Sequence, residues 1–189
     1  SHKLGIPKVV SLLSTCVYPH ESSFPLIEEN IHSGRPHSSN FGYAYAKRMV
    51  DVQSRAYRQQ YGSNFITAIP NNLYGPHDVF TEYRSHVVPA LIKRFSDERG
   101  NRSITNWGNG SAIREFIYVK DAARAICEFI ELEHDLQPVN IGTGIGTSIK
   151  ELAELTAKYM NYNGRLEWDT TKPNGVPRKV LNISKDNEN

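Results

Sequence analysis

The sequence predicts an α/β fold with a largely parallel sheet. Short apolar runs that suit buried strands alternate along the chain with longer stretches whose apolar residues recur at helical spacing. This alternation is typical of βαβ units, in which each helix carries the chain back to start the next parallel strand. The 189 residues, 39% of them hydrophobic, are enough for one compact domain with a smaller appendage.

The first part of the chain predicts a strand, a long loop, a helix and a second strand. Val9 to Leu13 is an apolar run expected to form a buried strand, and a loop containing several prolines follows it. A helix is expected from Phe41, after capping candidates at positions 38–40, and it is expected to stop at Gly62. Phe65 to Ile69 is expected to form the next strand.

Further helices and strands are expected beyond residue 80. The expected helices span Val87 to Glu98, Asp121 (as the cap) to Glu133, and a segment opened by the capping-box sequence Ser-Ile-Lys-Glu at Ser148. The expected strands span Ile104–Trp107, Glu115–Val119, Val139–Ile141 and Arg165–Trp168.

The bulk composition argues against several classes of function. Lys plus Arg number 22 against 20 for Asp plus Glu, a net charge of +2, which is too balanced to indicate nucleic-acid binding. No apolar run approaches the length of a membrane span, and the N-terminal residues lack the apolar core of a signal peptide. The two cysteines, Cys16 and Cys127, form neither a disulfide framework nor a metal-binding pattern. We therefore expect a cytoplasmic protein without a metal site, a nucleic-acid partner or a membrane partner, and we expect Cys127 in a helix core with Ala123, Ile126 and Ile130.

A glycine cluster at 142–147 has the local context of a phosphate-binding loop, because it follows a short strand and precedes a helix. Its spacing is G-x-G-x-G rather than G-x-G-x-x-G, so we interpret it as a tight turn and place no cofactor there. A dinucleotide-binding fold begins with a strand, a Gly-rich turn and a helix. Nothing before Val9 supplies these parts, so a chain of that fold is expected to begin here in its second half.

The segment Tyr43-Ala-Tyr-Ala-Lys47 carries the most informative chemical signal. Tyr43 and Lys47 are four residues apart on a predicted helix, so they stand on one face. A nearby ammonium favours the phenolate form of a tyrosine and suits it to general acid–base catalysis. This spacing alone is common on ordinary helices, but two strand ends frame it. Ser14 and Cys16 follow the first strand and a run from Pro70 follows the second, at the edge where parallel sheets bind ligands.

This order of strand-end serine, Tyr-x-x-x-Lys helix and strand-end Pro-x-Asn resembles the extended short-chain dehydrogenase/reductase family. Within that family, the chain is similar to the GDP-L-fucose synthases over nearly its whole length, through S-T-C-V-Y-P, N-L-Y-G-P-H-D, S-H-V-V-P-A-L-I-K-R-F, W-G-N-G-S-A-I-R-E-F and T-K-P-N-G-V-P-R-K. The resemblance implies the second half of a Rossmann-like doubly wound parallel sheet plus a smaller α/β substrate-binding lobe. Residues 1–80 are expected in the NADP-binding domain and 81–189 mainly in the lobe, with some segments returning to the sheet. The N-terminal Gly-rich half and the closing C-terminal helices are expected to be absent.

The resemblance also implies a reaction. The GDP-L-fucose synthases invert C3 and C5 of GDP-4-keto-6-deoxy-D-mannose and then reduce C4 with NADPH. By resemblance, Cys16 and His86 are the base and acid of the inversion. Tyr43 donates the proton in the reduction, while Ser14 hydrogen-bonds the carbonyl and Lys47 holds the nicotinamide ribose. From the residues alone, Cys16 equally suits a small buried side chain, and His86 a polar residue at a helix start.

Two groups of binding residues follow from the same resemblance. Those expected to bind NADP gather at the strand ends and the catalytic helix: Leu12, Leu13, Ser14, Thr15, Lys47, Pro70, Asn71, Asn72, Leu73 and His86. Those expected to bind the substrate are Arg94, Trp107, Arg114 and Lys172. An arginine fork suits a diphosphate, although cations and an aromatic residue also suit an ordinary surface and core. The family's usual Pro-Thr-Asn is Pro-Asn-Asn here.

Alternatives to this function stay open. A sister enzyme, such as a sugar-nucleotide 4-epimerase or 4,6-dehydratase, shares the scaffold, although those dehydratases usually carry acidic residues where this chain has Cys16. A non-catalytic nucleotide-sugar-binding fragment is the alternative from another class. The resemblance implies a homodimer through the Tyr-x-x-x-Lys helix and its neighbour. Met49, Val50, Val52 and Tyr57 supply apolar positions for it, and they would equally serve an intramolecular core.

Overall fold

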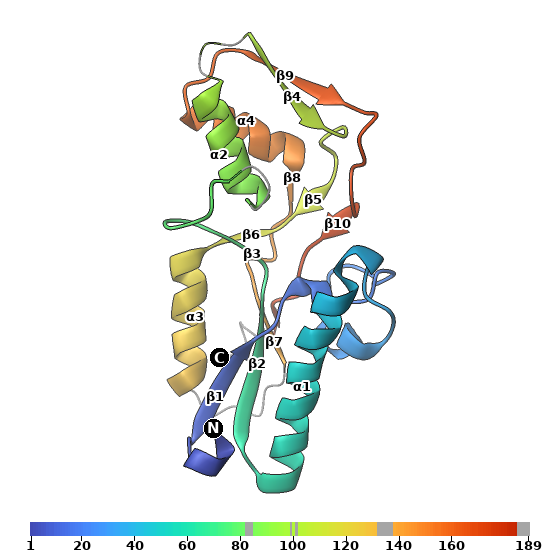
Figure 1. The fold of residues 1–189 in the computed structure, drawn as a ribbon, viewed down its shortest axis with the longest axis vertical. Helices are drawn as coiled ribbons and strands as arrows, with labels where there is room; N and C mark the ends of the chain where they lie inside the picture. The colour runs from blue at the N-terminus through green and yellow to red at the C-terminus, as the bar shows by residue number, and fades with distance from the viewer. Residues whose placement is uncertain (82–84, 99, 101, 132–137, 185–189) are drawn as a thin grey trace.

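The computed structural model describes residues 1–81, 85–98, 100, 102–131 and 138–184, and its main sheet is parallel throughout. Strands β1 (Lys8–Leu12), β2 (Asn64–Pro70) and β7 (Val139–Ile141) lie in the order β1-β2-β7. Helix α1 (Phe41–Tyr61) and helix α3 (Val119–Glu131) flank this sheet (Figure 1). The predicted α/β class with parallel pairing is confirmed.

Strand β2 is buried on both faces, as a strand between two helical layers must be. Ala68 packs with Val139 and Phe129 of α3, whereas the next residue, Ile69, packs with Leu13 and with Val50 of α1. Successive side chains of a strand point to opposite faces, so these two clusters form separate cores, one under each helix.

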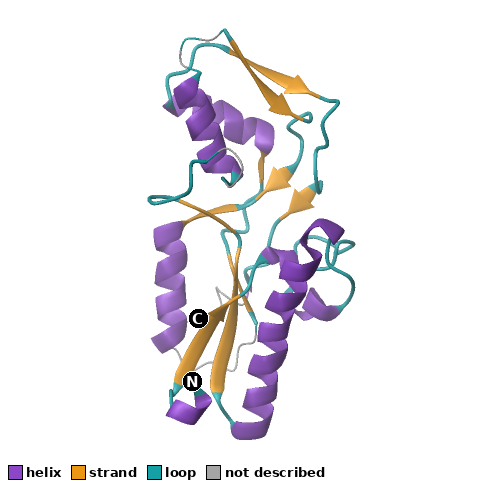
Figure 2. Ribbon diagram, in the orientation of Figure 1, coloured by secondary structure: helices purple, strands orange, loops and turns teal. Residues whose placement is uncertain are grey.

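A second group of elements forms the other end of the molecule (Figure 2). Helix α2 (Val87–Asp97) packs on helix α4 (Ile149–Tyr159), and strand β4 (Ser103–Trp107) pairs in parallel with β9 (Arg165–Asp169). Their core contains Leu91, Phe95, Ile104, Ala153 and Ala157, buried together. All four of these elements were predicted, with ends shifted by at most a residue or two.

Very short strands lie between the two ends of the molecule, and the sequence predicted few of them. Strand β3 (Asn72–Tyr74) pairs with β6 (Phe116–Tyr118), and β5 (Ile113–Arg114) lies between β10 (Arg178–Lys179) and β8 (Thr147–Ser148). Of these, only β6 falls within a predicted strand. Two- and three-residue strands are too short to show a periodicity, so pairing partners distant in sequence define them. The remaining elements are 3-10 helices, at His2–Leu4, Thr15–Val17, Glu28–His32 and Ser38–Asn40.

Two predicted helix ends are confirmed, the C-terminal end of α1 and the N-terminal cap of α4. Helix α1 stops at Gly62, which has φ of 64°, and Ser148 caps α4 by accepting the Glu151 N–H at 3.1 Å. Asn40, one of the predicted capping candidates, is the N-cap residue of α1, but its side chain makes no capping bond. The capping prediction for α3 was wrong: the helix begins at Val119, so Asp121 lies inside its first turn. The predicted extension of that helix to Glu133 lies outside the described residues.

The buried face of α3 also differs from the prediction. Ala122 and Phe129 are buried with Ala125 and Ile126 packed beside them, whereas Cys127 is exposed. Ala123 and Ile130 are exposed as well, so only Ile126 of the predicted core group contacts the core. Both faces of the helix carry apolar residues, and periodicity alone could not decide which face docks against the sheet.

Candidate active site

The two functional strand ends meet at one edge of the sheet. Because β1 and β2 run parallel, Ser14 after β1 and Asn71 after β2 lie at the same edge. Ser14 caps the 3-10 helix Thr15–Val17, and its hydroxyl oxygen accepts the backbone N–H of Cys16 at 3.3 Å. This bond fixes Cys16 beside Ser14, and the Cys16 side chain is half-buried.

Tyr43 and Lys47 approach this edge from α1. The Lys47 ammonium donates a 2.8 Å hydrogen bond to the carbonyl oxygen of Leu12, and it lies 5.9 Å from the centroid of the Tyr43 ring. The Tyr43 side chain is 52% exposed, so its hydroxyl is open to a ligand. The predicted dyad is thus held on one helix face against the end of β1.

A cavity of about 580 Å³ collects most of the predicted catalytic residues. Ser14, Cys16, Tyr43 and His86 all line it, although they come from separate segments of the chain. His86 immediately precedes α2 as its N-cap residue and has no side-chain capping bond. The cavity therefore places a tyrosine hydroxyl, a serine hydroxyl, a thiol and an imidazole around one space, as acid–base chemistry on a small substrate requires.

The predicted cofactor residues divide into two groups. The cavity is lined by Leu13, Ser14, Thr15, Pro70, Asn71, Asn72, Leu73 and His86. Leu12 and Lys47 do not line it, and they are joined to each other by the ammonium–carbonyl bond.

A buried carboxylate holds the cavity wall together. Glu115 is fully buried, and its carboxylate accepts the Asn71 amide at 2.9 Å and the Leu181 N–H at 2.8 Å. It also accepts the backbone N–H groups of Thr143 and Gly144 in the glycine cluster. The anion-binding amides of this turn are therefore occupied by a side chain of the protein itself, in agreement with its interpretation as a structural turn.

The four predicted substrate residues do not line this cavity. Arg94 and Trp107 lie on α2 and β4, Lys172 follows β9, and Arg114 lies on the short strand β5 between the two ends of the molecule. Arg94 on α2 donates to Thr105 O and Asn106 Oδ1, both at 3.1 Å. Arg114 on β5 donates to the carbonyl oxygen of its neighbour Ile113 at 2.8 Å, and burial lowers the pKa of its guanidinium.

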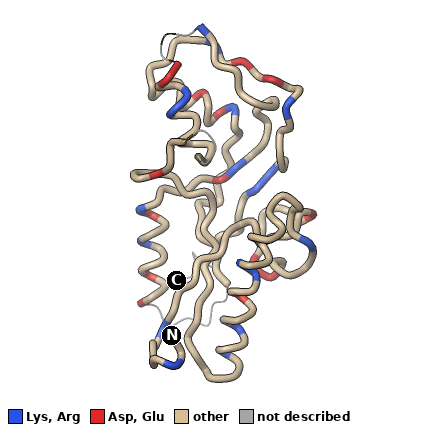
Figure 3. The backbone as a smooth tube through the Cα atoms, in the orientation of Figure 1, with Lys and Arg blue, Asp and Glu red and all other residues tan. Residues whose placement is uncertain are grey.

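Trp107, the last residue of β4, pairs with Lys172, which lies just after β9. The Trp107 ring is 67% exposed, and the Lys172 ammonium lies 5.9 Å from its centroid. An exposed aromatic face beside a cation suits the binding of a planar, charged ligand. Figure 3 shows that basic residues also mark β10 and the neighbouring β5, between this pair and the main sheet.

The lining of the cavity also includes Lys179, His77 and Asp78, which were not among the predicted site residues. Lys179 of β10 lines it, although the sequence gave it no role. His77 and Asp78, which belong to the N-L-Y-G-P-H-D segment, also line it. Asp78 accepts the backbone N–H of Val79 at 2.8 Å, and His77 has φ of 69°, a conformation uncommon outside glycine.

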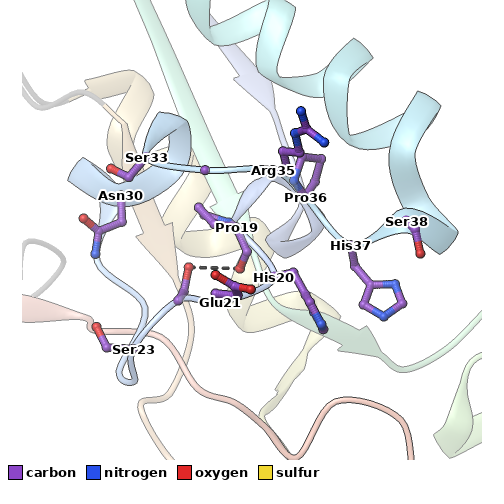
Figure 4. Close-up of a pocket in the computed structure, with 12 residues that line it drawn as sticks. Pro19, His20, Glu21, Ser23, Asn30, Ser33, Arg35, Pro36, His37 and Ser38 are labelled. Atoms are coloured by element: carbon purple, nitrogen blue, oxygen red, sulfur yellow. Dashed lines mark hydrogen bonds between the residues drawn. The ribbon is translucent and has the colours of Figure 1, made fainter.

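A second cavity, of about 680 Å³, lies in the loop between β1 and α1 (Figure 4). Its lining includes Arg35, His20 and His37, and the two imidazole rings meet edge to face with centroids 4.6 Å apart. Arg48 of α1 ties this loop down by donating to the carbonyl oxygens of Val17 and Gly34 at 2.8 and 2.7 Å. None of the predicted site residues lines this cavity.

Membrane and metal features are lacking in the described part of the chain. No helix there combines the length and the apolar character needed to cross a bilayer. No three His, Cys, Asp or Glu side chains among the same residues gather as metal ligands.

Comparison with known proteins gives a consistent result. The chain is 36% identical to a probable GDP-L-fucose synthase of Drosophila melanogaster and 37% identical to the GDP-L-fucose synthase of Escherichia coli K12. In both cases 98% of this chain aligns, and it spans 61% of the relative's length. The crystal structure of a GDP-L-fucose synthetase from Naegleria fowleri bound to NADP superposes with a TM-score of 0.91 at 34% identity. That superposition covers 97% of this chain and 60% of the other.

A family model matches more than half of the chain. The model described as the NAD dependent epimerase/dehydratase family matches residues 1–142, which include both strand ends and the Tyr-x-x-x-Lys helix. The chain belongs to the NAD dependent epimerase/dehydratase family.

Proposed function

We propose that this chain carries the epimerisation site and part of the reduction site of a GDP-L-fucose synthase. The observation that carries the proposal is the shared cavity of Ser14, Cys16, Tyr43 and His86. Inverting two centres beside a ketone and then reducing that ketone needs an acid–base pair and a separate proton donor, and these residues supply both. The GDP-L-fucose synthases among the relatives support the substrate assignment.

In the proposed epimerisation, Cys16 and His86 act on opposite faces of the sugar ring. The Cys16 thiolate removes the proton from a carbon beside the C4 ketone, and His86 returns a proton from the other side. Support for this pair is that both side chains line one cavity, with Cys16 anchored through its backbone N–H to Ser14. Inversion at C3 and C5 would use the pair twice.

In the proposed reduction, Tyr43 protonates the oxygen at C4 while Ser14 donates a hydrogen bond to it. NADPH, when bound, supplies the hydride. The residues of this edge fit such a cofactor, because Lys47 uses one of its three N–H donors on Leu12 and keeps others for ribose hydroxyls. The strand-end segment Pro70–Leu73 lines the space beside Tyr43, where the nicotinamide would bind.

The GDP moiety is proposed to bind along the second group of elements. Arg94 and Arg114 would contact the diphosphate, and the exposed Trp107–Lys172 pair would hold the guanosine side. Residues 1–80 would then serve as the later half of the NADP-binding domain and 81–189 mainly as the substrate lobe. Strand β7 lies within residues 81–189 but pairs with β2 in the main sheet. This pairing supports the expectation that some segments of the lobe return to the sheet.

The test is proton exchange without cofactor. The chain is incubated with GDP-4-keto-6-deoxy-D-mannose in deuterated water, without NADPH, and deuterium at C3 and C5 is measured by mass spectrometry and NMR. We expect exchange at both carbons that disappears in Cys16→Ser and persists in Cys127→Ser, the matched substitution on the exposed face of α3.

Absence of exchange is resolved by repeating the measurement with the chain restored to the length of its relatives. Exchange that appears only in the longer form would show that residues outside these 189 are needed to complete the site. No exchange in either form would overturn the proposal.

A second candidate function comes from solved structures of related reductases. A GDP-D-glycero-L-gluco-heptose synthase from Campylobacter jejuni superposes with a TM-score of 0.87 at 27% identity. A sister epimerase, dehydratase or reductase would be favoured if product analysis gave a 4-epimer, a dehydrated sugar or a reduced heptose instead of GDP-L-fucose. A non-catalytic nucleotide-sugar-binding fragment would bind the substrate without any exchange.

We also propose a cytoplasmic homodimer that pairs through α1. The buried face of α1 is largely polar, with Arg48, Asp51 and Ser54, whereas its outer face exposes Met49 and Val52 at 54% and 45%. This inverted pattern supports an apolar partner on the outer face. Val50 packs into the core and the Tyr57 ring meets the His2 ring edge to face, so these two serve the chain itself.

A further inference from the structure

The catalytic cavity is joined to a narrow crevice by three shared residues. The crevice, of about 20 Å³, is lined by residues of the 15–40 segment together with Val176 and Lys179. Thr15, Cys16 and Lys179 line both this crevice and the catalytic cavity. Thr15 is buried, so Cys16 and Lys179 supply the half-buried side chains at this junction.

Charged groups are scarce around the junction. Among the described residues that line either space, Lys179 is the one lysine or arginine and Asp78 the one carboxylate. The other titratable groups are Tyr18, His20 and His37 in the crevice and Tyr43, Tyr74, His77 and His86 in the cavity. Asp78 already accepts the N–H of Val79, and Lys179 has no carboxylate within ion-pair distance in the described part of the chain. A half-buried ammonium without an acidic partner favours an anion beside it.

Cys16 is the side chain that lines both spaces together with Lys179 and can become an anion. Its sulfur makes no hydrogen bond within the described residues, because the bond that anchors this residue uses the backbone N–H. A thiol acts as a base only as the thiolate, and adjacent cations stabilise that form.

We infer that Lys179 is a positioning residue for Cys16: its ammonium group holds the thiol in the thiolate form that can act as a base. The inference rests on the proposed function for its purpose, since the thiolate is the base of the epimerisation. In each inversion, the thiolate takes a proton from the carbon beside the ketone, the C–H electron pair passes into the enolate, and His86 protonates the opposite face. The Cys16 thiol then loses its proton to water and His86 regains one from water, which resets the pair for the next inversion. Lys179 keeps its own proton throughout, so its charge is present at the start of every cycle.

Lys179 comes from the far end of the sequence and reaches the site through strand pairing. Strand β10 pairs in parallel with β5, which sets Lys179 opposite Arg114. The next two residues, Val180 and Leu181, are buried, and the Leu181 N–H is held by Glu115. The backbone at Lys179 is therefore anchored by strand pairing and by the buried residues that follow it.

The experiment measures the reactivity of Cys16 without any sugar nucleotide. The 189-residue chain and its Lys179→Met and Lys179→Arg variants are treated with iodoacetamide at neutral pH, and alkylation of each cysteine is followed by peptide mass spectrometry. Cys127, exposed on α3, is the internal control in every sample. Circular dichroism melts verify that each variant is folded.

We expect Lys179→Met to slow alkylation of Cys16 by about tenfold, as the loss of a nearby opposite charge implies, with Cys127 unchanged. Lys179→Arg, which keeps the charge, should restore most of the rate, and this rescue excludes a purely steric role. An unchanged alkylation rate of Cys16 in folded Lys179→Met overturns the inference. If the same variant also binds the substrate more weakly, Lys179 is assigned to substrate binding instead. If Lys179→Met does not fold, two other measurements decide the question. Lys179→Gln should slow alkylation of Cys16 in the same way, and high salt should slow alkylation of Cys16 in the wild-type chain.

Failure of the proposed function is seen separately. One outcome would be that the alkylation rate of Cys16 depends on Lys179 while no form of the protein exchanges deuterium into the sugar. That outcome would support the role of Lys179 and contradict the proposed substrate.

Discussion

The Lys47 ammonium donates a 2.8 Å hydrogen bond to the backbone carbonyl oxygen of Leu12, which ties the early part of α1 to the carboxyl end of β1. Leu12 lies two residues before Ser14, and Lys47 lies one helical turn after Tyr43. The bond therefore sets the separation between the tyrosine on the helix and the serine at the strand end. Both hydroxyls line the same cavity as a result.

Replacing the proposed proton donor should separate the two halves of the reaction. Tyr43→Phe in the chain restored to the length of its relatives should lower NADPH oxidation by about 10²- to 10⁴-fold, because general acid catalysis is lost. Deuterium exchange at C3 and C5 should persist, since Cys16 and His86 are intact. Tyr45→Phe is the control, because Tyr45 is exposed on the same helix and does not line the cavity. Equal loss of both activities in Tyr43→Phe would contradict the assignment.

The outer face of α1 should control self-association. Met49→Glu with Val52→Glu places two carboxylates on the exposed apolar face and should convert a dimer to a monomer, because burying unpaired charges is costly. Leu155→Glu on the exposed face of α4 is the matched control and should leave the dimer intact. Sedimentation velocity over a range of concentrations measures the change. A dimer that survives the double substitution would place the interface elsewhere.

Removing the buried carboxylate should strongly destabilise the fold. Glu115→Ala leaves the Asn71 amide and the backbone N–H groups of Gly144 and Leu181 without their acceptor. We expect a loss of roughly 3–5 kcal/mol in the free energy of unfolding, the usual cost of breaking a buried charged network. Urea denaturation compares it with Glu154→Ala on the exposed side of α4, which should change stability by less than about 0.5 kcal/mol. Similar midpoints for the two variants would be evidence against a central role of Glu115.

A buried tyrosine should make the protein sensitive to alkaline pH. Burial, reinforced by the negative charge of Glu28, raises the pKa of Tyr18, and its hydroxyl donates to Asn140 Oδ1 at 2.5 Å. A tyrosine whose pKa is raised on folding contributes stability below the unfolded pKa of about 10, and that stability is lost as the pH rises further.

The substitution Tyr18→Phe tests this pH dependence. It should lower the free energy of unfolding by about 1–2 kcal/mol at pH values below the tyrosine range, because Asn140 loses a donor. The difference from wild type should shrink above a pH of about 10, where the unfolded wild-type tyrosine ionises. Guanidinium denaturation across this range measures it, and a difference that stays constant into alkaline pH would show that Tyr18 does not titrate on unfolding.

Long elements with a clear period could be predicted from the sequence. The helix predicted from Phe41 to Gly62 forms as α1, and it ends at a glycine in the left-handed region. The apolar run from Phe65 to Ile69 lies within β2. Ser148 caps its helix as the Ser-Ile-Lys-Glu sequence predicts. Each of these features depends on neighbours within a few residues, so local chemistry is sufficient to determine it.

Other features depend on residues far apart in sequence, and only the tertiary structure decided them. Strand β10 exists because it pairs with β5, more than sixty residues earlier, and this pairing places Lys179 in the lining of the same crevice as Cys16. Helix α3 has apolar residues on both faces, and docking against the sheet decided that Phe129 is buried and Cys127 exposed. The sequence by itself determined which elements form and which residue types carry the chemistry, because periodicity and capping are local. The tertiary structure decided which side chains share a cavity, because long-range pairing and packing create that proximity.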